Sequence, residues 1–333
     1  MPNAPESTDS TTAPPEPATA VAAGSEPTAA VLVDLRGRIV DWYAANKRDL
    51  PMRAESVSPW GTLVGEVMSQ QTPMPRVQPF WSRWMERWPT PQALADASPA
   101  DVLVEWGSLG YPSRALRLRD CAIAIANRPG GRVPADYEEL LSLPGIGPYT
   151  ASALVSFQFH GRIAVLDTNI RRVLVRTLEG IERPASSAPT AAERALADRM
   201  LPADGAECAT WNVAVMEFGA LVCTQRSPAC EECPVADLCR WTAAGWPASG
   251  TRTRAQAWTG TDRQARGRVM ALLRDRHAGS ASADPSGASR AEALAAATLP
   301  GADPEQAPRV LAGLLADGLV VEGAAGRLSL PSA

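Results

Sequence analysis

Apolar residues recur at intervals of three and four positions through most of residues 31–244. One such set is Leu63, Val64, Val67 and Met68. This spacing places the apolar side chains on one face of an α-helix. Proline and glycine interrupt the pattern at short intervals, and no convincing alternation of apolar and polar residues is present. The pattern therefore predicts many short helices and an all-α fold.

The last part of the chain has a different order of predicted elements. Helical patterns cover residues 263–277, 290–297 and 304–316, and two short strands flank residues 323–326. Three helices followed by a hairpin predict a small winged-helix-like unit. The predicted domains are a tail at 1–30, a main helical domain at 31–249, a Gly-, Thr- and Arg-rich linker at 250–262 and the C-terminal unit at 263–333.

The first 30 residues are rich in Pro, Ala, Ser and Thr, with four acidic residues and no Lys or Arg. Such a segment buries too little apolar surface to offset its ordering entropy, so we predict a disordered acidic tail. The formal net charge of the whole chain is -4, and this segment accounts for all of it. The remainder is near neutral, so the acidic balance does not exclude a nucleic-acid partner.

The composition excludes several classes of protein. The chain has no apolar run of about 18 residues, so we expect no membrane-spanning helix. The N-terminus lacks the basic start and apolar stretch of a secretory signal. Six cysteines are too few for a disulfide scaffold in a chain of 333 residues. We therefore expect a cytoplasmic protein, and we also expect a monomer.

Four cysteines lie close together, at Cys223, Cys230, Cys233 and Cys239, with the spacing C-x6-C-x2-C-x5-C. Four thiolates in one short loop can surround a metal centre, either iron–sulfur or structural zinc. Zinc sites usually pair two short C-x2–4-C elements, and only one is present here. The spacing resembles the [4Fe–4S] loop of endonuclease III and MutY DNA glycosylases, which implies a [4Fe–4S] cluster with a structural and DNA-positioning role. We expect the other two cysteines, Cys121 and Cys208, to be buried.

A turn with the sequence Gly-x-Gly lies between two predicted helices, at Gly145 and Gly147. Such a turn lets backbone N–H groups approach a phosphate, and the following helix N-terminus favours negative charge. The same pattern also occurs in simple tight connections. With Leu-Pro before it and a small-residue helix after it, the segment resembles the helix-hairpin-helix element of DNA glycosylases, which binds duplex backbone. The next helix carries three arginines that are either further phosphate contacts or an ordinary solvated face, Arg171, Arg172 and Arg176.

Two carboxylates are candidates for a catalytic pair. Taken alone, Glu66 is an acid at the border of an apolar helix face, and Asp167 is a helix N-cap. Breaking an N-glycosidic bond needs an acid to protonate the leaving base and a carboxylate to stabilise the cationic sugar. An apolar pocket would keep Glu66 protonated, and a hydrogen-bonded helix N-terminus would suit an ionised Asp167. The pair thus has the chemical asymmetry that this reaction needs.

Residues 36–244 are similar to a MutY-type adenine DNA glycosylase. The matching stretches are 41–43, 66–72, 109–111, the hairpin, 166–169 and 216–220 before the cysteines. The resemblance implies base excision repair at the nucleoid, with adenine removed from double-stranded DNA where it is mispaired with 8-oxoguanine or guanine. The base would first be flipped out of the stack, since its glycosidic bond is inaccessible inside the duplex.

The resemblance also implies the roles of the catalytic residues. Glu66 is the acid that protonates adenine and later activates water, and Asp167 stabilises the sugar cation. Asn169 assists the aspartate. Lyase-competent relatives carry a nucleophilic Lys where this chain has Tyr149, so the resemblance implies a monofunctional glycosylase. Lys47 is the only lysine in the chain, and it lies far from the hairpin in sequence.

Further positions match residues that contact DNA in the family. Arg53 and Glu217 match positions that contact the extruded adenine. Gln71 and Tyr111 match positions that wedge into the duplex near the opposing 8-oxoguanine. Three departures from the family pattern lie near these positions, at Met52, Ser69 and Pro112. The C-terminal unit is unlike the nudix-like domain of many relatives and resembles the short tail of actinobacterial members.

Two other functions fit parts of the sequence. One is an endonuclease III-like bifunctional glycosylase and AP lyase acting on oxidised pyrimidines, which shares the hairpin and the cysteine loop. The other is a non-catalytic DNA-binding protein that uses the winged-helix-like unit as its reader. Trapping of a covalent adduct would support the first. Binding without turnover, with no measurable effect of Glu66→Gln on base release, would support the second.

Overall fold

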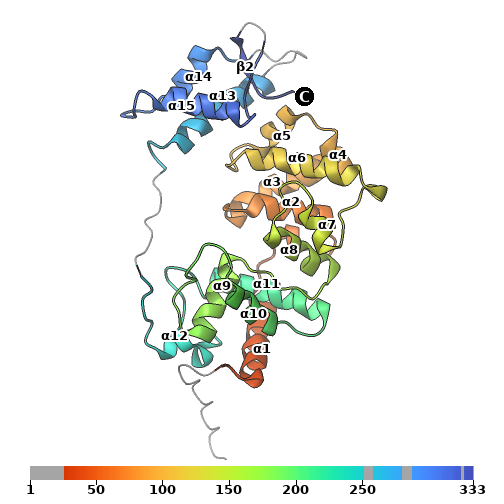
Figure 1. The fold of residues 1–333 in the computed structure, drawn as a ribbon, viewed down its shortest axis with the longest axis vertical. Coiled ribbons are helices and arrows are strands. Elements are labelled where there is room, and N and C mark those ends of the chain that lie inside the picture. Colours follow the sequence, from red (N-terminus) through yellow and green to blue (C-terminus); the bar gives the residue numbers. More distant parts are fainter. Residues whose placement is uncertain (1–25, 251–257, 280–286, 324–325, 333) are drawn as a thin grey trace, which may run out of the picture.

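The computed structural model describes residues 26–250, 258–279, 287–323 and 326–332, and their regular secondary structure is almost entirely helical (Figure 1). The main domain contains α1 (Ala29–Asn46), α2 (Pro59–Ser69), α3 (Met74–Arg87), α4 (Pro91–Ala95), α5 (Pro99–Trp106), α6 (Ser113–Ala126), α7 (Tyr137–Leu141), α8 (Pro148–Phe159), α9 (Thr168–Leu174), α10 (Ala191–Arg199), α11 (Gly205–Leu221) and α12 (Arg240–Ala243). Single helical turns lie at η1 (Pro51–Arg53), η2 (Pro129–Gly131), η3 (Val175–Glu179) and η4 (Ala236–Leu238). The predicted all-α class is confirmed.

Three of these helices begin at a Ser or Thr followed by proline. The side-chain oxygens of Ser58, Thr90 and Ser98 each accept a hydrogen bond from a backbone N–H of the first turn, at 3.1–3.2 Å. The proline that follows each cap occupies the first helical position, where its missing N–H has no partner to lose. These local signals set the starts of α2, α4 and α5.

The main domain packs around two hydrophobic cores. Helices α2–α8 enclose the first, which includes the fully buried Trp84 and Trp106. Helix α1 and helices α9–α11 enclose the second, which includes Ile39 and Phe218. Figure 1 shows the second group below the first, with α8 beside α11. We call the two groups the α2–α8 lobe and the α1/α9–α12 lobe, and the catalytic candidates lie where they meet.

The C-terminal unit contains α13 (Asp262–Ala278), α14 (Arg290–Ala297), α15 (Gln306–Ala316), β1 (Val321–Glu322) and β2 (Leu328–Ser329). The two strands pair antiparallel, with Val321 opposite Ser329. The predicted order of three helices and a hairpin is present, and the likeness to a winged helix stays a prediction. Helix α13 packs against α5, and its buried residues Val269 and Leu273 join the core of the α2–α8 lobe.

The predicted tail and linker fall largely outside the described residues. Residues 26–30 are described, and they belong with the main domain: α1 begins at Ala29 with Thr28 as its N-cap. Arg199 contacts the Glu26 carboxylate and donates to the Pro27 carbonyl. Residues 251–257 of the linker also lie outside the described part. None of the described helices is both long and apolar enough to cross a membrane.

Candidate active site

Glu66 is the only charged residue of α2, and the helix around it is buried on nearly all sides. Its Oε2 atom accepts a hydrogen bond of 2.8 Å from the hydroxyl of Tyr149, at the start of α8. Burial raises the pKa of Glu66 above its usual 4.5, although the Tyr149 hydrogen bond and the charge of Arg53 oppose this, and nearby Asp167 adds to the rise. The burial expected for this carboxyl group is present, but its side chain has the polar neighbours Tyr149, Arg53 and Asp167.

Tyr149 keeps its proton under all ordinary conditions. Burial raises its phenolic pKa well above 10, and the charges of Glu66 and Asp167 raise it further. Its hydroxyl is therefore a permanent donor to Glu66 and not a nucleophile. The tyrosine lies at the second position of α8, directly after the hairpin turn, so the fold of that turn fixes where the hydroxyl points.

Asp167 lies across the lobe junction and caps α9, as predicted. Its Oδ1 accepts from the backbone N–H of Ile170 at 2.6 Å, and its Oδ2 accepts from the Asn169 side chain at 2.7 Å. These bonds favour the ionised form, yet burial outweighs them, so the pKa of Asp167 is raised above 3.8. The hydrogen-bonded setting was predicted, and the burial that opposes it was not.

Three arginines that follow Asp167 are buried: Arg171, Arg172 and Arg176. They are therefore neither phosphate contacts nor part of a solvated helix face. Arg171 pairs with Glu193 at 2.9 Å, and Arg176 donates to the carbonyls of Thr224 and Glu182 at 2.7 Å each. Arg172 bonds the side-chain oxygen of Asn169 at 2.9 Å and the carbonyl of Cys223 at 2.8 Å. Arg172 and Arg176 thus join the start of the cysteine loop to α9 and η3, and Arg171 joins α10 to α9.

Glu217 is fully buried on α11, where two arginines neutralise it. Arg48 donates from Nε and Nη2 to the two carboxylate oxygens at 2.6 and 2.8 Å, and Arg53 donates from Nη1 at 2.7 Å. Burial alone would raise the pKa of Glu217, but the two arginines outweigh it and lower the pKa to about 2. The structure thus brings together the predicted pair Arg53 and Glu217. It adds Arg48, which sequence alone did not single out.

Lys47 and the three departures from the family pattern, Met52, Ser69 and Pro112, lie in different parts of the main domain. Lys47 ends α1 with its Nζ 5.8 Å from the centre of the Tyr43 ring, in a different element from the hairpin. Met52 is buried in the core of the α2–α8 lobe, and Ser69 donates to the carbonyl of Glu66 at 3.0 Å. Pro112 precedes α6 as its N-cap residue. The structure thus accommodates all three departures: Met52 in a core, Ser69 in a hydrogen bond and Pro112 before a helix.

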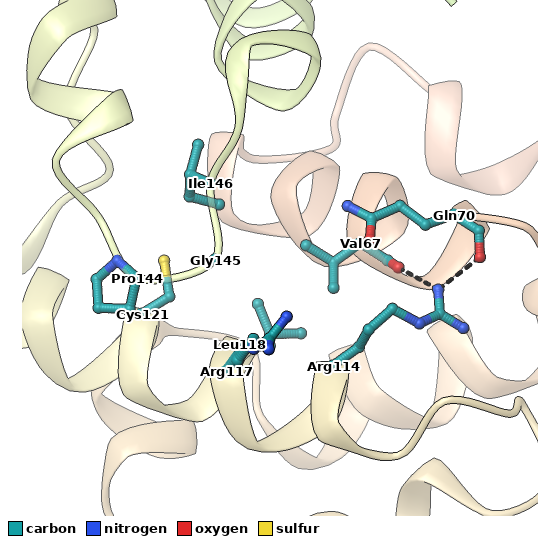
Figure 2. Close-up of a pocket in the computed structure, with 9 residues that line it drawn as sticks. All are labelled: Val67, Gln70, Arg114, Arg117, Leu118, Cys121, Pro144, Gly145 and Ile146. Carbon is teal, nitrogen blue, oxygen red and sulfur yellow. Dashed lines mark hydrogen bonds between the residues drawn. The ribbon is translucent and has the colours of Figure 1, made fainter. Parts of the chain in front are cut away.

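Gln71 and Tyr111 are exposed, and both have a backbone that non-glycine residues rarely adopt. Their φ angles are 57° and 49°, in the left-handed region. Arg114 of α6 joins the two loops through hydrogen bonds to the carbonyls of Val67 (2.8 Å), Gln70 (2.7 Å) and Gly110 (3.1 Å). Figure 2 shows the bonds to Val67 and Gln70. One guanidinium thus fixes the loops of both predicted wedge residues.

The Gly-x-Gly turn connects α7 and α8 as predicted. Gly145 has a φ of 76°, and a side chain there would press on Arg117 of α6, 3.2 Å from its Cβ. Gly147 is the N-cap of α8 and has no side chain to fill its own cap. A pocket opens beside this turn, lined by Val67, Gln70, Arg114, Arg117, Leu118, Cys121, Pro144, Gly145 and Ile146 (Figure 2). Glu66 and Asp167 do not line it.

The four clustered cysteines form one loop against α9 and η3. Burial, together with the charges of the other three cysteines, raises the pKa of the Cys233 thiol to about 12, so all four cysteines lie in one neighbourhood. Within the described part of the chain, no three His, Cys, Asp or Glu side chains are grouped closely enough to hold a single metal ion. Four cysteine thiolates are the ligand set of a [4Fe–4S] cluster. The remaining cysteines, Cys121 and Cys208, are buried as predicted.

Known proteins that match this chain identify its family. Residues 64–198 match the HhH-GPD superfamily of base excision DNA repair proteins, and residues 223–239 match the iron–sulfur binding domain of endonuclease III. The adenine DNA glycosylase of Mycolicibacterium smegmatis is 47% identical over 293 residues, which cover 88% of this chain and 94% of that protein. The chain belongs to the adenine DNA glycosylase family. It is therefore a DNA glycosylase enzyme of base excision repair, with an endonuclease III-type [4Fe–4S] loop.

Further relatives are similar to this member of the adenine DNA glycosylase family in sequence or in fold. The Mycobacterium tuberculosis adenine DNA glycosylase is 48% identical and covers 88% of this chain and 92% of its own. A solved structure of a thermostable thymine-DNA glycosylase has a TM-score of 0.59 and 25% identity, over 65% of this chain and 98% of that one. A solved endonuclease III–DNA complex has a TM-score of 0.56 at 22% identity, which shows the shared fold.

Proposed function

We propose that this chain is a monofunctional adenine DNA glycosylase that removes adenine mispaired with 8-oxoguanine, or with guanine, from double-stranded DNA. The observation that supports this best is the meeting of two partly buried carboxyl groups, Glu66 and Asp167, from opposite lobes. Relatives named adenine DNA glycosylase match over nearly their whole length. Our proposal includes action as a monomer on chromosomal DNA, at the nucleoid in the cytoplasm.

In the proposed reaction, Glu66 acts first as the acid. Its carboxyl proton passes to the extruded adenine while the bond between the base nitrogen and sugar C1′ breaks, and the bonding pair leaves with the base. The sugar becomes cationic, and the carboxylate of Asp167 stabilises it. Glu66, now ionised, takes a proton from a water molecule as the water oxygen bonds to C1′. The products are free adenine and an abasic site in an uncut strand.

Two neighbours support these carboxyl groups. Tyr149 holds the Glu66 carboxyl group by its hydroxyl, at 2.8 Å, so that the acid keeps one orientation. Asn169 holds Asp167 at 2.7 Å. Because both contacts already hold the carboxyl groups in position, these groups need not reorganise during the reaction. Tyr149 has no amine for an imine, and Lys47 lies at the end of α1, so the proposal predicts no lyase step.

The pocket for the extruded base is assigned to Arg53 and Glu217. Glu217 anchors Arg53 at 2.7 Å, and Arg48 holds the other side of Glu217, so the three side chains support one another. The Arg53 side chain remains partly exposed, which leaves N–H groups for an adenine ring nitrogen. Arg53 also acts on the charge of Glu66, so the pocket and the acid share one electrostatic environment.

Binding of the duplex is assigned to the hairpin and the two wedge residues. Gly145 and Gly147 allow close approach of a backbone phosphate to the amides before α8. Arg117 is exposed beside this turn and adds a positive charge there. Gln71 and Tyr111 would enter the stack near the opposing 8-oxoguanine, with their loops fixed by Arg114.

The decisive experiment is a single-turnover assay of base release. The duplexes carry adenine opposite 8-oxoguanine, adenine opposite guanine, thymine opposite guanine, and thymine glycol opposite adenine. We expect release from the two adenine duplexes, and its loss in Glu66→Gln and Asp167→Asn. Glu138→Gln, an exposed acid on α7, serves as the matched control and should keep the wild-type rate.

The thymine arm is included because relatives named thymine-DNA glycosylase share this fold, one with 33% identity over 208 residues. Release of thymine alone would replace adenine as the assigned base. Borohydride trapping on the thymine glycol duplex tests the lyase alternative, which requires a covalent adduct. Binding without release from any duplex would favour a non-catalytic DNA-binding protein.

A further inference from the structure

The C-terminal unit places an arginine directly against one of the predicted wedge residues. The Cζ of Arg263, at the start of α13, lies 4.9 Å from the centre of the Tyr111 ring and 5.1 Å from that of Trp258. Arg114 of α6 lies 5.7 Å from the Tyr111 ring and 5.2 Å from that of Trp106. Guanidinium groups and aromatic rings thus alternate from the main domain into the C-terminal unit.

Arg263 is exposed and keeps its donors free. Within the described residues it makes no hydrogen bond or ion pair, and its contacts are with the two aromatic rings. Other arginines of the unit are engaged by carboxylates, in the pairs Arg266–Asp317, Arg276–Glu292, Arg290–Glu322 and Arg309–Asp262. A guanidinium can stack through its face while its N–H edge binds a phosphate. Arg263 therefore has the character of a ligand-binding arginine.

The position of Arg263 over Tyr111 is fixed by packing. Helix α13 buries Val269, Met270 and Leu273 in a core that is continuous with the α2–α8 lobe, and it contacts α5. Its far end places His277 4.0 Å from Asp101. The stack itself faces solvent, because Tyr111 is 43% exposed and Trp258 is 52% exposed. The C-terminal unit thus extends the surface on which Tyr111 stands.

We propose that Arg263 and Trp258 are DNA-contacting residues, and that Arg263 binds a backbone phosphate of the strand that faces the extruded adenine. This rests on the proposed function, which puts Tyr111 into the duplex near the base left unpaired. A side chain stacked on Tyr111 then lies beside the same strand, where the nearest chemical group for a free guanidinium is a phosphodiester. Trp258 keeps the guanidinium plane in place, and the C-terminal unit becomes part of the DNA-binding surface.

The test compares Arg263→Ala with Arg268→Ala, in the full chain carrying Glu66→Gln so that the duplex stays intact. Arg268 is a matched control, since it is exposed on the same helix and carries the same charge. Affinity for the adenine:8-oxoguanine duplex is measured over a range of salt concentrations. We expect Arg263→Ala to weaken binding about tenfold and to reduce the log–log salt slope by about 0.9, the value for one phosphate contact. Arg268→Ala should leave both near the starting values.

Two further variants separate charge from stacking. Arg263→Lys keeps the charge, so it should restore most of the salt slope while recovering affinity only in part. Trp258→Ala removes the stacking partner and should weaken binding about threefold without changing the salt slope. Equal affinity and equal slope for Arg263→Ala and Arg268→Ala would overturn the inference.

The proposed function fails separately from this inference. Base release by the chain with Glu66 intact is measured on the same duplexes. Release of adenine with no difference between Arg263→Ala and Arg268→Ala overturns the phosphate contact alone. A reduced salt slope in Arg263→Ala without release of any adenine overturns the substrate assignment and supports the DNA-contacting surface.

Discussion

At the scale of single residues, the carboxyl group of Glu66 is set by three neighbours from three parts of the chain. Tyr149 donates a hydrogen bond that favours its ionised form, and Arg53 acts in the same direction by charge. Asp167 acts in the opposite direction, and burial exceeds all of them. The raised pKa of this acid is therefore a balance that single substitutions should shift in a predictable direction.

Replacing Tyr149 by phenylalanine should move the pH dependence of base release. The variant loses the hydrogen bond to ionised Glu66, so the pKa of Glu66 rises further. Since the acid works only when protonated, activity is present below its pKa and lost as pH rises through it. We expect the alkaline limb of the single-turnover rate to shift to higher pH. An unmoved limb would show that this bond does not set the acid.

Replacing Glu217 by glutamine should destabilise the fold. The change leaves Arg48 and Arg53 without their buried counter-charge, which costs about 3 kcal/mol in the free energy of unfolding at neutral pH. Because the pKa of Glu217 falls from 4.5 to about 2, its contribution is complete above pH 4.5 and disappears as pH falls towards 2. The gap between variant and wild type should close over that range in denaturant titrations. Glu55→Gln, an exposed acid, should show no gap at any pH.

At the scale of elements, the site depends on a close approach of α11 to the start of α9. A Cβ on Gly219 would lie 2.8 Å from the Asn169 Cβ and 3.0 Å from its carbonyl oxygen. The missing side chain also lets Arg172 reach the Gly219 carbonyl at 2.6 Å. Gly219 therefore allows α11 to pack closely against α9, and this packing keeps the helix capped by Asp167 in place.

Gly219→Ala should lower the rate of base release about 10- to 100-fold, because it pushes Asn169 and with it Asp167 out of position. It should also lower stability by about 1–3 kcal/mol through overpacking. Gly37→Ala is the matched control, since this helical glycine of α1 has open space around its Cα and alanine there should be neutral or stabilising. Rates are compared by single turnover and stabilities by thermal unfolding. Wild-type activity in Gly219→Ala would contradict this role.

At the scale of the whole molecule, the net charge is distributed unevenly along the chain. The segment 1–30 carries the whole net charge of -4, while the remainder of the chain is near neutral. The proposed DNA contacts must therefore come from locally placed groups. The end of the predicted tail belongs to the main domain, because Thr28 caps α1 and Glu26 contacts Arg199. The boundary relevant to truncation therefore lies before residue 26.

Removal of residues 1–25 should leave base release intact. The deletion takes away three acids, Glu6, Asp9 and Glu16, and keeps the contacts of Glu26. DNA affinity should stay the same or tighten by up to about twofold at low salt, because less negative charge then faces the duplex. Fluorescence anisotropy at two salt concentrations measures this. A large loss of activity would mean that the tail takes part in the reaction.

Comparison of the predicted and observed site shows which signals were local. The N-cap at Asp167, the turn at Gly145 and the cysteine loop each depend on a few adjacent residues, so their patterns were visible in the sequence. Helix starts at Ser-Pro and Thr-Pro pairs are equally local. Arg171 and its neighbours were mistaken for surface residues, because a cation in a sequence does not reveal whether a distant carboxylate or carbonyl will meet it.

The sequence by itself determined the helical class, the hairpin, the iron–sulfur loop and the identity of the two catalytic candidates. Only the tertiary structure decided their partners: Arg48 for Glu217, Arg172 for Asn169, and Arg263 for Tyr111. The raised pKa of Asp167 was also decided there, because burial at the lobe junction outweighs the bonds of its own N-cap. Capping and periodicity act within one or two helical turns, whereas burial and ion pairing depend on packing between elements far apart in the chain.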